Sequence, residues 1–90
     1  MKTLQEIEKM FKDAKINVHF NYAGAANIQK LSDGKMYKTI YLSKYTHADR
    51  AIELLKSLGH TIEPMFGKER GINLCNAYFK YSVTFNIESD

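Results

Sequence analysis

The first fifteen residues carry apolar side chains at every third or fourth position, which is the spacing of one face of a helix. These apolar residues are Leu4, Ile7, Met10, Phe11 and Ala14. Thr3 and Glu6 fit a capping box, in which the hydroxyl and the carboxylate each accept a hydrogen bond from a backbone amide. The pattern therefore predicts a helix that begins at Thr3 and ends near Lys15.

The period changes to two after the first helix. Apolar and polar residues alternate from Ile16 to Tyr22, as in a strand with one buried face. Two further segments, 27–31 and 35–43, flank Asp33-Gly34, a pair that readily adopts the dihedral angles of a tight turn. We expect these two segments to form an antiparallel hairpin.

The second strand of this hairpin has two distinct faces. We expect one face, made of Met36, Lys38, Ile40 and Leu42, to contact the core, with Lys38 as its unusual member, and the other to carry Tyr37, Thr39, Tyr41 and Ser43.

Residues 46–59 predict a second helix. Thr46 fits its N-cap with Asp49 in the first turn, and Gly59 fits the left-handed residue that follows a helix. A short strand at 62–64 should lie at an edge of the sheet, because Pro64 has no amide proton to donate. We expect residues 67–76 to form a loop.

The strongest strand pattern covers residues 79–87. Its expected apolar face consists of Phe79, Tyr81, Val83, Phe85 and Ile87. The order α-β-β-β-α-β-β predicts one α+β domain over residues 1–90, with a mainly antiparallel sheet and both helices packed on one face. The length of 90 residues allows one core, and 44% apolar with 26% charged residues excludes a disordered chain.

The sequence is typical of a cytoplasmic protein. Its apolar runs are too short to cross a bilayer, and its beginning lacks the apolar stretch of a secretory signal. The single Cys75 cannot form an internal disulfide, in agreement with a reducing compartment. No membrane partner is expected.

The residues capable of chemistry do not form a recognisable motif. His19, His47, His60 and Cys75 lie in four different predicted elements and lack metal-ligand spacing. We therefore predict no metal, no cofactor and no enzymatic activity. The opposing hypothesis is a small enzyme that acts through His60, Cys75 or the glycine-flanked loop at 67–71.

Positive charge is concentrated in one part of the chain. The net charge is +3, and residues 16–45 alone sum to +3. Tyrosines lie among these lysines, so a sheet face there would suit acidic protein surfaces or nucleic acid. Alternatively, the tyrosines stabilise the sheet and the lysines keep its edge soluble. The candidate partner-binding residues are Tyr37, Tyr41, Tyr45, Lys35, Lys38, Lys44, Lys68 and Arg70.

Residues 33–51, DGKMYKTIYLSKYTHADRA, resemble the last hairpin and helix of AP2-like and integrase arm-type DNA-binding domains. The resemblance implies a three-stranded sheet against one helix. It does not extend to the arginine and tryptophan base readers of that family, because the hairpin has no Arg and the chain has no Trp. In size and style the chain also resembles short α+β proteins of phages and mobile elements, many of which inhibit host defence nucleases.

We therefore expect a small non-enzymatic binding protein that docks on a protein or nucleoprotein partner, as a phage or mobile-element inhibitor of host defence (anti-CRISPR-like). The alternative is a nucleic-acid-binding domain in which Lys35, Lys38 and Lys44 contact phosphates. A homodimer would form if an edge strand, such as 79–87, paired with its own copy.

Overall fold

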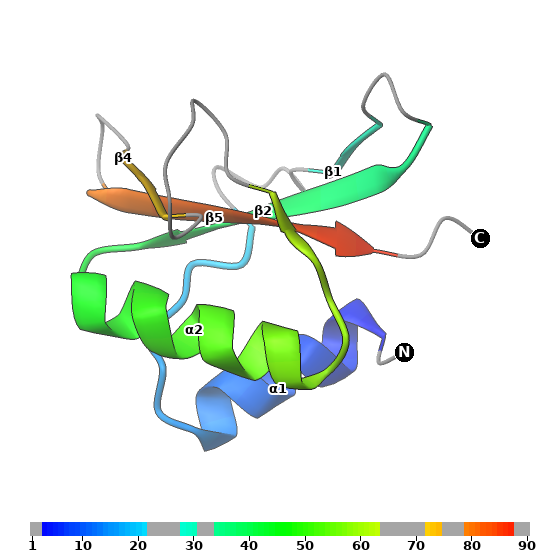
Figure 1. The fold of residues 1–90 in the computed structure, drawn as a ribbon. Helices are drawn as coiled ribbons and strands as arrows, with labels where there is room; N and C mark the ends of the chain where they lie inside the picture. The colour runs from blue at the N-terminus through cyan, green and yellow to red at the C-terminus, as the bar shows by residue number, and fades with distance from the viewer. Residues whose placement is uncertain (1–2, 22–27, 31–33, 64–71, 75–78, 88–90) are drawn as a thin grey trace.

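The computed structural model describes residues 3–21, 28–30, 34–63, 72–74 and 79–87. In chain order the elements are α1 (Leu4–Asp13), β1 (Ile28–Lys30), β2 (Met36–Leu42), α2 (Tyr45–Ser57), β3 (Ile62–Glu63), β4 (Ile72–Leu74) and β5 (Tyr81–Ile87). Both helices lie on the same face of the sheet (Figure 1). The predicted α+β class with an antiparallel sheet is confirmed.

The sheet is built around β5. Its strand order is β1-β2-β5-β3, and β4 also pairs with β5. The β2–β5 ladder runs from Met36↔Ile87 to Leu42↔Tyr81, while β3 and β4 follow one another along the opposite side of β5. Because β5 has neighbours on both sides, strand 79–87 is central and is not the edge strand through which two copies of the chain would pair.

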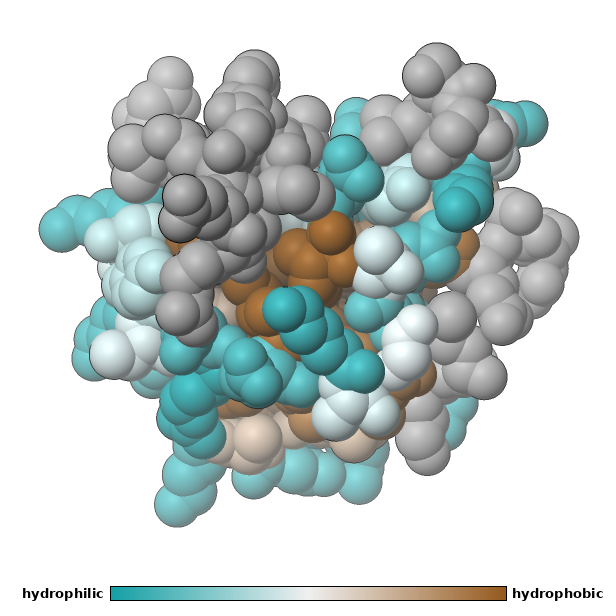
Figure 2. Space-filling view, in the orientation of Figure 1, coloured by the Kyte–Doolittle hydropathy of each residue, from teal (hydrophilic) through white to brown (hydrophobic). Residues whose placement is uncertain are grey.

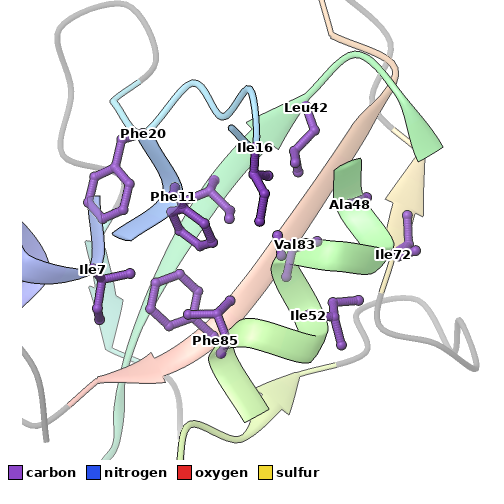
Figure 3. Close-up of a cluster of buried hydrophobic side chains, with 13 residues drawn as sticks. Ile7, Phe11, Ile16, Phe20, Leu42, Ala48, Ile52, Ile72, Val83 and Phe85 are labelled. Atoms are coloured by element: carbon purple, nitrogen blue, oxygen red, sulfur yellow. The ribbon is translucent and has the colours of Figure 1, made fainter. Parts of the chain in front are cut away.

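The hydrophobic core lies between the sheet and the helices. Ile7 and Phe11 of α1 are buried with Phe85 of β5 (Figure 3). From α2, Ala48 and Ile52 complete the same cluster. Hydrophobic colour gathers between the sheet and α2 in Figure 2. Within the described part of the chain, neither helix has the length and hydropathy required to span a membrane.

The first helix begins as its sequence predicts. The Thr3 amide donates to Glu6 Oε1 at 3.1 Å, and the Glu6 amide donates to Thr3 Oγ1 at 3.2 Å. This is the reciprocal capping box, which satisfies two backbone donors at the start of α1.

Both helices end in the same hydrogen-bond pattern. The Ile16 amide bonds the Phe11 carbonyl and the Lys15 amide bonds the Lys12 carbonyl. After α2, the His60 amide bonds the Leu55 carbonyl, and the Gly59 amide bonds that of Lys56. These paired bonds are Schellman motifs, which require a left-handed residue. That residue is Gly59 (φ 91°) in α2, as predicted, but Lys15 (φ 58°) in α1.

The start of α2 differs from the prediction. The N-cap is Lys44 instead of Thr46, and the Lys44 side chain makes no capping hydrogen bond. Asp49 therefore lies beyond the first turn. Tyr45 joins the helix and packs its ring edge-on against Tyr81, with 5.6 Å between ring centroids. The earlier start of α2 is thus accompanied by a contact with a strand distant in sequence. Capping rules, which use only neighbouring residues, cannot predict such a contact.

Residues 16–21 do not form the regular strand that their alternation predicts. Their single pairing among the described residues is the isolated bridge His19↔Tyr41. The alternation nevertheless marks the correct side, because Ile16 and Phe20 are buried while Asn17 and His19 are exposed. Thus the segment is extended and half-buried, but it is not a continuous ladder.

Three predictions concern the turns and the edge. The hairpin is confirmed by the pairing of β1 with β2 and by the positive φ of Gly34, although Asp33 lies outside the described residues. The edge position of the short strand is confirmed for β3, whereas Pro64 itself lies outside those residues. The loop predicted at 67–76 is wrong at 72–74, where β4 pairs with β5; the other residues of that range are not described.

The two left-handed positions predict opposite effects of substitution. Lys15→Gly should raise the free energy of unfolding by about 0.5–1 kcal/mol, because glycine adopts positive φ without steric cost. Gly59→Ala should lower it by about 1 kcal/mol. An added Cβ at Gly59 meets no atom of the described residues within 4 Å, so the expected cost comes from the dihedral angle. Urea unfolding of both variants measures these changes, and a destabilised Lys15→Gly would contradict the assignment.

A second prediction concerns His47, whose Nδ1 accepts a hydrogen bond from the Asn17 amide at 2.9 Å. His47→Ala should lower the free energy of unfolding by about 1 kcal/mol, because that amide loses its acceptor. His47→Asn is the matched control, since its Oδ1 offers an acceptor near the same place. Equal stability of the two variants in urea unfolding would show that the bond does not hold this segment.

Candidate partner-binding surface

The predicted binding residues do not form one continuous accessible patch. Lys35 and Lys44 are exposed, Tyr45 is 46% exposed and Tyr41 is half-buried, but Tyr37 and Lys38 are only 4% and 1% exposed. The expected accessibility of Tyr37 and Lys38 is therefore wrong. Lys68 and Arg70 lie outside the described residues.

Tyr37 is buried on the sheet face opposite the helices. Thr84 shares that face and is fully buried, with its hydroxyl oxygen 2.8 Å from that of Thr39. The alternation along β2 thus assigns Tyr37 to the correct face, but that face is covered at its centre. Alternation predicts which way a side chain points and does not predict what lies above it.

Lys38 faces the helices, and its ammonium group makes specific contacts there. Nζ donates to the Phe20 carbonyl at 2.7 Å and to Asn21 Oδ1 at 3.1 Å. It also lies 4.3 Å from the centroid of the Phe20 ring, a cation–π geometry. Lys38 therefore attaches residues 20–21 to β2 instead of presenting a charge to a partner.

Burial changes the proton affinity of this lysine. Desolvation lowers the pKa of Lys38 below its ordinary value of 10.5, because the charged form loses contact with water. The negative charge of Glu8 acts in the opposite direction and offsets part of this effect. Burial of the charged ammonium therefore costs free energy, and deprotonation of Lys38 removes that cost.

The accessible aromatic residues gather at one end of the β2–β5 ladder. His19 and Phe79 stack with 4.1 Å between ring centroids, and Tyr41 lies 5.9 Å from the same Phe79 ring. The bridge His19↔Tyr41 fixes the first of these rings beside β2. Phe79 precedes β5 and joins this group, so its predicted place on the core-facing side of the strand is wrong.

A second aromatic pair lies at the same end of the ladder. Tyr45, the first residue of α2, contacts Tyr81, which pairs with Leu42 at the end of β2. Lys44 and Lys80 beside them are exposed. We call these seven residues the aromatic end surface: His19, Tyr41, Lys44, Tyr45, Phe79, Lys80 and Tyr81. The register places Tyr81 on the helix side of the sheet and Tyr41 on the opposite side, so this group includes both faces of the sheet at that end. It lies at the left of Figure 1, where β5 begins and α2 follows β2.

His47 and His60 both make hydrogen bonds with the backbone. His47 Nδ1 accepts the Asn17 amide. His60 is 4% exposed, donates from Nδ1 to the Asn86 carbonyl at 2.7 Å and packs its ring edge-on against Phe85. Its buried Nε2 has no hydrogen-bond partner among the residues that the structure describes. Cys75 and residues 67–71 lie outside the described residues.

No three His, Cys, Asp or Glu side chains of the described residues converge on a common point where they could hold a metal ion.

Comparison of the chain with protein-family models, with curated proteins and with solved structures gave no match in any of the three. The site is therefore defined by its geometry alone.

The lowered pKa of Lys38 predicts a pH dependence of stability. The unfolded chain binds more protons than the folded one between the folded pKa and 10.5, so stability rises with pH in that window. Below this pH window, the cost of burying the charged Lys38 lowers the free energy of unfolding in full. Above it, Lys38 is neutral in both states and this cost disappears.

The measurement compares the native chain with Lys38→Met by urea unfolding from pH 7 to 11. The free energy of unfolding of the native chain should increase with pH relative to Lys38→Met. Lys30→Met, which removes an exposed lysine on β1, should follow the native chain. A native chain that loses stability relative to Lys38→Met on alkalinisation would contradict the assigned direction.

Proposed function

We propose that this chain is a small non-enzymatic binding protein that docks its aromatic end surface on an acidic face of a protein or nucleoprotein. The observation that carries the proposal is the exposed Tyr45 beside the exposed Lys44, with Tyr81 supporting the tyrosine ring. The inhibitory role, of the phage or mobile-element type, is supported by likeness of size and style. The proposal includes no reaction, cofactor or membrane partner.

Tyrosine at this position suits recognition of a protein. A tyrosine ring brings large contact area with few rotatable bonds, which keeps the entropic cost of docking small. The edge-on contact with Tyr81 restrains the Tyr45 ring before any partner arrives. A helix and a ladder of seven residue pairs carry the surface, so it is pre-organised.

Direct nucleic-acid binding is the second candidate, and the position of Lys38 weakens it. Of its three predicted phosphate contacts, Lys38 is buried and Lys35 lies at the opposite end of β2 from Lys44. The aromatic end surface therefore offers Lys44 and Lys80. Two cations correspond to a salt slope of about 2 on duplex DNA, well below that of proteins making about 6–10 phosphate contacts.

The test begins with capture of partners from the native host's extract, with and without nuclease treatment. The dissociation constant of the captured partner is then measured for the native chain and for Tyr45→Ala. Loss of a central interface tyrosine should weaken binding by about 2 kcal/mol, or roughly thirtyfold. Tyr45→Phe keeps the ring and should bind within a few-fold of the native chain.

Lys30→Ala serves as the matched control for charge, because Lys30 pairs with Met36 at the far end of β2. It should leave binding nearly unchanged, while Lys44→Ala should slow association. Capture that is lost on nuclease treatment, together with a steep linear fall of log affinity with log salt, would favour the nucleic-acid candidate. Unchanged binding by Tyr45→Ala would refute docking through this surface.

A further inference from the structure

Strand β1 forms one edge of the sheet. It stands at the end of the strand order, beside β2, and no described strand pairs with its outer side (Figure 1). Alternate residues of a strand direct their N–H and C=O groups to opposite sides, so part of the backbone of β1 faces outward. An edge of this kind can receive a further strand from another chain.

The side chains of β1 are accessible as well. Ile28, Gln29 and Lys30 are all exposed. Among the described residues, two large hydrophobic side chains are exposed, and these are Tyr45 and Ile28, the latter at 40%. Tyr45 belongs to the aromatic end surface, whereas Ile28 lies away from it, on the edge strand. Contact with an apolar residue of an added strand would remove this isoleucine from water.

The pairing of β1 with β2 fixes the direction of each side chain on β1. Ile28 pairs with Lys38 and Lys30 pairs with Met36, so both side chains lie on the helix side of the sheet. Gln29 lies on the other side. A strand added antiparallel to β1 would therefore place one residue opposite Lys30 and, two positions later, another opposite Ile28, both on the helix side.

These two positions favour different side chains. Opposite charges across a strand pair attract and like charges repel, so the residue opposite Lys30 should be acidic. Among the described residues, no carboxylate lies within ion-pair distance of the Lys30 ammonium. The residue opposite Ile28 should be apolar and β-branched, because such side chains pack well across a sheet.

A second copy of the chain does not meet these requirements. If two β1 strands paired over all three residues about a twofold axis, each Ile28 would face a lysine of the other copy. We propose that β1 instead binds an extended acidic segment of another protein as an added antiparallel strand, in which Asp or Glu is followed two residues later by Val or Ile. This site is independent of the aromatic end surface, which lies at the opposite end of β2.

The experiment is an amide NMR titration of the full chain with the capped peptide Thr-Glu-Thr-Val-Thr. The amides of Ile28, Gln29 and Lys30 should shift in a saturable manner at millimolar concentrations, because three residues offer few contacts. A control peptide has proline in place of the central Thr and of Val. It should not bind, because one of these two consecutive residues must face β1 and neither retains an N–H donor.

An exchange of charge tests the register. Lys30→Glu should weaken binding of the Glu peptide about fivefold, and the peptide Thr-Lys-Thr-Val-Thr should restore binding to this variant. Restored binding also shows that the variant is folded. Lys56→Glu, the same change at an exposed position of α2, should leave peptide binding unchanged. Tyr45→Ala should leave it unchanged too, which separates this site from the aromatic end surface.

Four results would each overturn the proposal. They are binding of the proline peptide, equal affinity of Lys30→Glu for the Glu and Lys peptides, the absence of saturable shifts, and shifts of the β1 amides that grow with protein concentration when no peptide is present. The last result would show that a second copy of the chain occupies this edge.

Discussion

Side-chain hydrogen bonds, together with the single backbone bridge His19↔Tyr41, hold the connection between α1 and the sheet, and the rest of the structure depends on this attachment. Lys38 donates to the Phe20 carbonyl, His47 accepts the Asn17 amide, and Arg50 donates to the Ala14 carbonyl at 2.7 Å. These bonds satisfy backbone groups that a paired strand would otherwise satisfy. They also set α1 over the sheet, where Ile7 and Phe11 close the core.

Local sequence rules predict the parts of this fold that depend on local physics. The capping box of α1, the left-handed Gly59 and the turn at Gly34 need only neighbouring residues to form, and each is present. The errors involve distant partners. Residues 16–21 pair with β2 at one bridge only, and the side chains of Lys38 and His47 bond other backbone groups of this segment. Helix α2 begins one residue before Thr46, with Tyr45 packed on Tyr81. Strand β4 is too short for a pattern of period two.

The same distinction, between features set by neighbouring residues and features set by distant ones, applies to the candidate site. Period-two alternation correctly separates the two faces of β2, because side-chain direction is a property of the strand itself. Exposure is a property of the whole fold. Alternation therefore could not show that Tyr37 is covered, or that Phe79 turns toward His19 and Tyr41. The antiparallel register joins the end of β2 to the start of β5, and only that register reveals the aromatic end surface.

Residues 19 and 20 connect the buried Lys38 with the aromatic end surface. The Phe20 carbonyl accepts a hydrogen bond from Lys38, and the adjacent His19 bridges to Tyr41 and stacks on Phe79 at the aromatic end surface. Lys38, a charged residue on the core-facing side of β2, thus holds this segment in place through its hydrogen bonds. Its cost in desolvation is opposed by its hydrogen bonds to the Phe20 carbonyl and Asn21 Oδ1 and by its contact with the Phe20 ring.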